Sequence, residues 1–140
     1  MTKKYKIVSK YIKDMSSETP DIETYIFVKE YISKYQLNID INSKPLKNRM
    51  IEVNTILKFE DKQENKKKSY FEINYSTIVK INDEIKEKSE LEKIILCDVQ
   101  IEIYPGLEES FLNLLHNSGY PDIKFEKKID FEQLYNQRLN

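Results

Sequence analysis

The chain has 140 residues and a formal net charge of -1, from 23 Lys and Arg against 24 Asp and Glu. This near balance excludes a globally basic nucleic-acid-binding protein. The mean hydropathy of -0.66, without any apolar run near the roughly 18 residues of a membrane span, excludes a membrane-inserted protein. One Cys excludes an internal disulfide framework and a multi-Cys metal site. We expect one domain over residues 1–140 in the cytoplasm, because the basic start leads into no apolar signal segment.

Alternating apolar and polar residues predict strands along the first half of the chain. The alternation is clear over 35–42, 51–60 and 71–81, and the short connections favour an antiparallel meander. Residues 6–17 alternate only roughly and predict an edge strand that ends before Pro20. In this strand Ile7, Tyr11 and Met15 are expected on one side, and Ile12, Asp14 and Ser16 on the other. Residues 21–34 form a connection of undetermined shape.

The pattern changes to helical spacing after residue 82. Apolar residues at i, i+4, i+7 and i+8 predict a helix that Gly119 and Pro121 end: Leu107, Phe111, Leu114 and Leu115. Asp130 and Gln133 form a capping-box pattern before a short terminal helix. Residues 91–104 fit a strand or a helix, and Pro105 is expected to interrupt either one. Strands first and helices last indicate an α+β fold.

Candidate catalytic and cofactor-binding groups are few. Cys97 and His116 are the only residues of their types, and we interpret them as a core thiol and a helix-end His, because a nucleophilic pair needs a third, orienting group. Two glycines cannot build a phosphate-binding loop. The acidic pairs 83–84 and 108–109 and the basic run 66–68 are interpreted as solvated surface. We therefore expect no enzyme activity, no metal and no cofactor.

Four segments together resemble the SecB family of tetrameric protein-export chaperones. They are Tyr11–Pro20, the strand pair Leu37–Ile41 with Ile51–Val53, the strand Phe71–Tyr75, and the terminal stretches Ser118–Pro121 and Ile129–Tyr135. They run in the family's order over nearly the whole chain. The chain departs from the family pattern near Pro105, where the usual Cys-Pro pair is missing and Glu108 stands where an Arg is common.

The resemblance implies a four-stranded antiparallel sheet with C-terminal helices packed on one face. It also implies a homotetramer, a dimer of dimers, that holds unfolded precursor proteins without ATP and hands them to the SecA motor. It places SecA contacts at Asp14, Glu18 and Glu72, which alternation puts on a polar sheet face. It frames a client-binding groove with Ile26, Phe27, Tyr31, Ile101 and Tyr104.

Two other functions stay open at this point. One is a SecB-like chaperone dedicated to a single client, such as a toxin–antitoxin system. The other is a small-ligand-binding or enzymatic α+β domain, although the sequence offers no evident polar lining for a ligand pocket. Under the leading interpretation, neither nucleic acid nor stable membrane insertion is expected.

Overall fold

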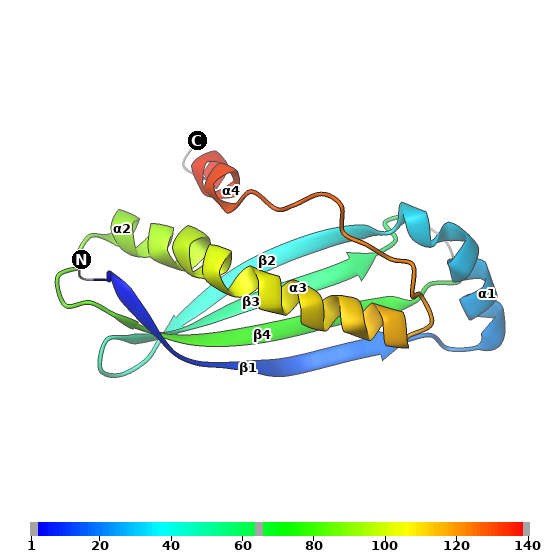
Figure 1. The fold of residues 1–140 in the computed structure, drawn as a ribbon, viewed down its shortest axis with the longest axis horizontal. Helices are drawn as coiled ribbons and strands as arrows, with labels where there is room; N and C mark the ends of the chain where they lie inside the picture. Colours follow the sequence, from blue (N-terminus) through cyan, green and yellow to red (C-terminus); the bar gives the residue numbers. More distant parts are fainter. Residues whose placement is uncertain (1–2, 64–65, 139–140) are drawn as a thin grey trace.

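A computed structural model describes residues 3–63 and 66–138 of the chain. Four antiparallel strands form one sheet in the order β1-β4-β3-β2 (Figure 1). The strands are β1 (Tyr5–Glu18), β2 (Gln36–Pro45), β3 (Met50–Glu60) and β4 (Tyr70–Ile81). The three alternating segments of the sequence are β2, β3 and β4, and the N-terminal segment is the edge strand β1, as predicted.

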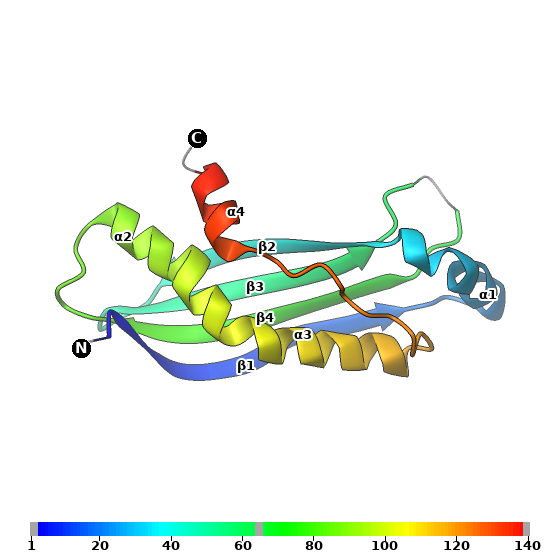
Figure 2. The ribbon, with the colours of Figure 1, turned by 45° about the horizontal axis from the view of Figure 1, so that its top comes forward.

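Helices and an extended segment cover one face of this sheet (Figure 2). The connection of undetermined shape contains α1 (Ile22–Tyr31) and the short 3-10 helix η1 (Ile32–Lys34), which lie beyond one end of the sheet. After β4, the chain forms α2 (Lys88–Lys93), the π-helical η2 (Ile94–Asp98), the long α3 (Val99–Asn117) and the terminal α4 (Phe131–Arg138). The expected α+β class, with an antiparallel sheet and C-terminal helices on one face, is confirmed.

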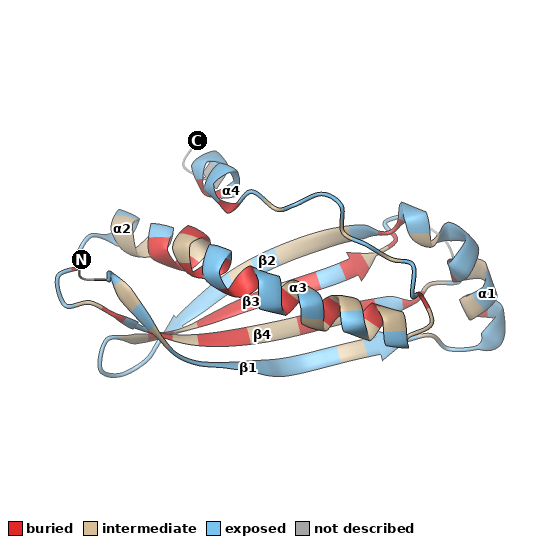
Figure 3. Ribbon diagram, viewed as in Figure 1, coloured by how far each residue is buried: buried red, intermediate tan, exposed pale blue. Residues whose placement is uncertain are grey.

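The core lies between α3 and the odd-numbered residues of the two central strands (Figure 3). The predicted face of α3 is buried here, with Leu107, Phe111 and Leu115 fully inaccessible to solvent. Residues on the sheet side include Val53, Leu57, Ile73 and Val79, which are also fully inaccessible. Among the described residues, no helix lies on the opposite face of the sheet, and we call this face the open face.

The predicted facing of β1 was wrong for two of its residues. The pairing with β4 shifts by one residue between Ile7 and Ser9 and again between Ile12 and Asp14. Each extra residue reverses the facing of everything after it, because side chains alternate with period two. Tyr11 therefore lies opposite Ser76 on the open face, and Ile12 lies opposite Tyr75 on the helix-covered face.

The segment 91–104 is helical, and Pro105 does not interrupt it. Pro105 lies inside α3, so the expectation of a break there was wrong. A proline removes one backbone hydrogen bond, to the carbonyl four residues earlier. That carbonyl belongs to Ile101, whose side chain is 52% exposed, so solvent can reach this side of the helix.

Candidate functional site

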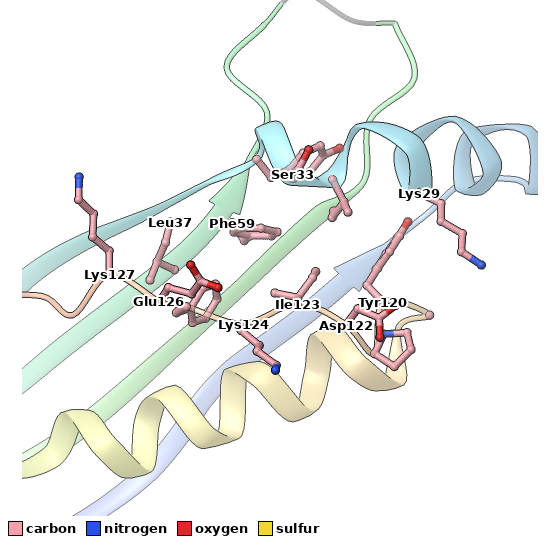
Figure 4. A pocket seen from close by; sticks show the side chains of 15 residues that line it. Lys29, Ser33, Leu37, Phe59, Tyr120, Asp122, Ile123, Lys124, Glu126 and Lys127 are labelled. Carbon is pink, nitrogen blue, oxygen red and sulfur yellow. The ribbon is translucent and has the colours of Figure 1, made fainter.

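The main hollow of the molecule lies where β2, the α1–η1 end and the segment after α3 meet (Figure 4). It has a volume of about 790 Å³. Its walls come from three parts of the chain, represented by Lys29 and Ile32, by Leu37, and by residues 119–127. We call residues 119–127 the strap, because they run from the end of α3 back across the sheet toward α4 (Figure 1).

Aromatic side chains form the floor of this hollow. Tyr35, Phe59 and Tyr120 line it and are each at least nine-tenths buried. The ring centroids of Tyr35 and Phe59 are 5.5 Å apart, and those of Phe59 and Phe125 are 5.6 Å apart in an edge-to-face arrangement. Such ring pairs give a rigid apolar surface with polar groups only at the Tyr hydroxyls. The floor suits apolar or aromatic side chains of a bound molecule.

The rim of the hollow is charged with both signs. Lys29, Lys124, Lys127, Asp122 and Glu126 surround the opening, and the three lysine side chains point outward in Figure 4. All five are exposed, so they stay hydrated while the floor remains apolar. A hollow of this kind combines an apolar floor with a charged, hydrated edge.

Specific hydrogen bonds hold the walls in place. The Tyr25 hydroxyl of α1 donates to the Gly119 carbonyl at 2.9 Å, which ties α1 to the start of the strap. A ring nitrogen of His116 lies 2.9 Å from the Ile123 carbonyl, which fixes the strap against the end of α3. The Ser69 amide donates to the Tyr35 hydroxyl at 3.0 Å, and burial raises the pKa of that hydroxyl.

The five residues expected in a client groove lie in two separate places, and none of them lines the hollow. Ile26, Phe27 and Tyr31 lie on α1, where the rings of Phe27 and Tyr31 are 4.6 Å apart and Ile26 is 57% exposed. Ile101 and Tyr104 lie on α3 toward the other end of the sheet. Ile101 is exposed, whereas Tyr104 is buried against the Phe131 ring of α4 at 5.4 Å.

The strap residues were missed in the sequence, although one signal marks them. Ile123 and Phe125 alternate with charged residues directly after Pro121, in a segment that is not part of the sheet. Alternation outside a sheet indicates an extended segment that lays one side on an apolar surface. No local pattern indicated that the strap lies beside Leu37 and Phe59, because these residues come from distant parts of the sequence.

The three expected SecA contacts share the open face. Asp14 pairs with Asn74, Ser16 with Glu72, and Glu18 with Tyr70, so Asp14 and Glu18 flank Glu72 diagonally. Diagonal neighbours of this kind are about 7–8 Å apart. Glu72 also lies 3.7 Å from the Lys58 ammonium group in an ion pair. Asp14, Glu18 and Glu72 therefore form an acidic cluster on the open face, and Lys58 of β3 partly neutralises it.

The Cys and the His do not form a reactive pair. Cys97 is fully buried in η2, and burial raises the pKa of its thiol, while His116 lies in the last turn of α3. About 19 residues of helix separate them, a distance of about 28 Å. Within residues 3–63 and 66–138, no three His, Cys, Asp or Glu side chains gather as a metal site. Among the same residues, no helix has the length and hydropathy to cross a membrane.

Comparison with known proteins settles the family. The family model for the preprotein translocase subunit SecB matches residues 1–140. The chain belongs to the SecB family. A putative protein-export protein SecB from Pelagibacter ubique is 65% identical over 140 residues, which cover all of both chains. A protein-export protein SecB from Methylocella silvestris is 22% identical over 130 residues, covering 93% of this chain and 79% of the relative.

A solved structure shows the same fold. It is a SecB-like chaperone from Mycobacterium tuberculosis in complex with a peptide from an antitoxin. It matches with a TM-score of 0.62 and 11% identity, covering 90% of this chain and 91% of that chain. SecB proteins are chaperones, so the expectation that this chain is not an enzyme is confirmed.

Proposed function

We propose that this chain is an ATP-independent holdase that binds unfolded precursor proteins in the cytoplasm and delivers them to SecA. The observation that carries the proposal is the aromatic-floored hollow between Leu37 and the strap, on a chain of the SecB family. An unfolded segment offers apolar side chains spaced along an extended backbone. The floor accepts such side chains, and the mixed charges of the rim leave the rest of the segment hydrated.

Suppression of aggregation tests the holding step. Light scattering of a urea-denatured secretory precursor, diluted into buffer without ATP, should fall as the chain is added in increasing ratio. A Leu37→Ser, Ile123→Ser variant should bind the precursor roughly tenfold more weakly, because two partly buried apolar contacts are lost. The matched control is Ile22→Ser with Leu46→Ser, two exposed apolar residues outside the hollow. Unchanged scattering at every ratio would contradict the holdase.

Competition distinguishes a general chaperone from a dedicated one. Unrelated unfolded proteins should displace the bound precursor if the hollow binds apolar side chains of any sequence. Resistance to every unrelated competitor would instead support the dedicated alternative, to which the antitoxin-peptide complex of the mycobacterial neighbour gives a precedent.

We place SecA docking on the acidic cluster of the open face. The triple variant Asp14→Ala, Glu18→Ala, Glu72→Ala should weaken SecA binding, most visibly at low salt, because exposed charges are screened over about 8–10 Å at higher salt. Holding of the precursor should survive, since the hollow lies on the covered side of the sheet. A control that also removes three negative charges is Glu84→Ala, Glu102→Ala, Glu109→Ala, away from the cluster. Normal SecA binding by the triple variant at low salt would leave the cluster as a solvated face.

We also propose a homotetramer built as a dimer of dimers. The edge strand β1 carries exposed apolar side chains at Val8, Tyr11, Ile12 and Met15, and its outer backbone groups have no strand partner in the described chain. Size-exclusion chromatography with light scattering should give the mass of four chains. Leu114, half-buried on α3, tests the helix layer: Leu114→Asp should lower the mass or the melting temperature, and retention of both would contradict this assignment.

A further inference from the structure

Three lysines converge at the end of the sheet farthest from the hollow. Lys6 of β1 and Lys80 of β4 lie directly opposite each other in the pairing register. Together with Lys3 they line a second cavity of about 550 Å³. In Figure 1 this end holds the N-terminus and the start of the α2 connection, while α1 and the beginning of the strap lie at the other end.

The backbone around these lysines is fixed at several points. The neighbouring pair, Tyr5 with Ile81, faces the helices: the Tyr5 hydroxyl donates to the Asp98 carbonyl at 3.3 Å, and Ile81 is buried. Lys6 and Lys80, one residue along, therefore share the open face. The Asn82 amide donates to the Lys4 carbonyl at 2.9 Å, and its side-chain Nδ2 donates to the Lys3 carbonyl at 3.2 Å. These bonds hold Lys3 beside the end of β4.

The three ammonium groups are not neutralised by the described part of the chain. None of Lys3, Lys6 and Lys80 forms an ion pair there. Two nearby carboxylates have other partners: Asp83, which also lines the cavity, lies 3.3 Å from Arg49, and Glu90 lies 3.4 Å from Lys4. Like charges placed directly opposite across two strands destabilise a sheet. A bound anion would relieve that repulsion.

We propose that Lys3, Lys6 and Lys80 form a binding site for a phosphate group. Lysine binds phosphate as a point charge, and several lysines around one cavity match a group that carries close to two negative charges. The cavity is large enough for a diphosphate or for a phospholipid headgroup, and both present the same chemistry. The site is separate from the client-binding hollow, so both can be occupied together.

Pyrophosphate and lipid vesicles test the site on the full chain at constant ionic strength. Pyrophosphate should raise the melting temperature saturably, because a ligand that binds only the folded state stabilises it. The variant Lys6→Gln, Lys80→Gln should bind at least about tenfold more weakly by calorimetry, since two charge-assisted contacts are lost. The matched control, Lys10→Gln with Lys34→Gln, removes the same charge from exposed lysines outside the cavity and should bind normally.

The lysine dependence separates the outcomes. Saturable pyrophosphate binding that is lost in Lys6→Gln, Lys80→Gln supports the site with a free phosphate compound as its ligand. Lysine-dependent flotation only with phosphatidylglycerol vesicles, and not with phosphatidylcholine vesicles, supports the site with a lipid headgroup. Equal weakening in the control variant would overturn it, as would the absence of any binding. It is also overturned if the double variant loses oligomeric mass without added anion, because a second copy's carboxylates would then be the partners of these lysines.

Discussion

Gly119 is required at its position for two independent reasons. Its φ of +107° lies in the left-handed region, which ends α3 and starts the strap. A Cβ there would lie 2.6 Å from Cε1 of the Tyr25 ring, the same side chain whose hydroxyl bonds to the Gly119 carbonyl. Gly119 thus determines both where the chain leaves α3 and how closely Tyr25 of α1 packs against the start of the strap.

The two glycines of the chain give a matched pair of substitutions. Gly119→Ala should lower the free energy of unfolding by about 1–3 kcal/mol, from backbone strain and displacement of the ring. Gly106 lies inside α3 with open space around its Cβ position, so Gly106→Ala should raise it by about 0.5–1 kcal/mol. Urea denaturation measures both changes. Equal effects of the same sign would show that the strap does not depend on the conformation of Gly119.

Asp21 makes the start of α1 sensitive to acid. Hydrogen bonds from Thr24 lower the pKa of the Asp21 carboxyl, and the Thr24 amide donates to Asp21 Oδ1 at 2.7 Å. Because the folded pKa is lowered, the stabilisation by this cap is complete above the ordinary value near about 4 and is lost as pH falls through the folded value. The protection of the Thr24 amide, measured as its exchange rate relative to the intrinsic rate at the same pH, should therefore fall at acidic pH. Asp21→Asn, which still caps but does not titrate, should remove this pH dependence, whereas Glu23→Gln should keep it.

At the scale of elements, η2 depends on a side chain that bridges helix and sheet. Gln100 is fully buried; its Oε1 accepts from the Thr55 hydroxyl at 2.8 Å, and its Nε2 donates to the Ile95 carbonyl at 3.1 Å. The second bond satisfies a carbonyl within the π-helical turn, and the first joins that turn to β3. Gln100 therefore fixes where the helical layer begins over the sheet.

Removing the two hydrogen bonds of the Gln100 side chain should lower stability, by an amount that depends on which buried polar groups lose their partners. Gln100→Leu should destabilise the fold by about 1–3 kcal/mol, because buried polar groups lose their partners. Adding Thr55→Val removes one orphaned hydroxyl, so the double variant should be less destabilised than the sum of the single changes. Chemical denaturation of all three variants measures the coupling. Strict additivity would mean that the two residues act separately.

The sequence predicts elements well where one local period is present and poorly where two periods compete. In β2, Leu37, Ile39 and Ile41 alternate without interruption, and their strand was predicted over 35–42, whereas β2 continues for three more residues to Pro45. In 91–104, Ile95, Cys97 and Val99 alternate like a strand and are all buried. They are nevertheless helical, and η2 also packs against α4, so burial there is not confined to one side of the helix. In β1, two extra residues broke the period, and only pairing with β4 shows where. The hollow was not predictable, since Leu37 and Ile123 meet only in the tertiary structure.

At the scale of the whole molecule, we propose that the chain unfolds as one domain. The strap ties α3 to α1, and the Tyr135 hydroxyl of α4 donates to the Ser89 carbonyl of α2 at 3.1 Å, so both α1 and α4 are joined to the helical layer. Circular dichroism and tyrosine fluorescence should therefore report one coincident transition in urea. Separate midpoints for helix loss and for the tyrosine signal would contradict this expectation.

The strand order has a consequence for synthesis of the chain. The first strand to leave the ribosome, β1, pairs only with the last, β4, and its earliest contact along the chain joins Glu18 to Tyr70. At about 5–20 residues per second, the roughly 50 residues between them take roughly 3–10 s to make. Throughout that interval Tyr11, Ile12 and Met15 belong to a nascent strand without a partner. During its own synthesis, this member of a chaperone family therefore exposes apolar side chains of the kind that chaperones bind in other nascent polypeptides.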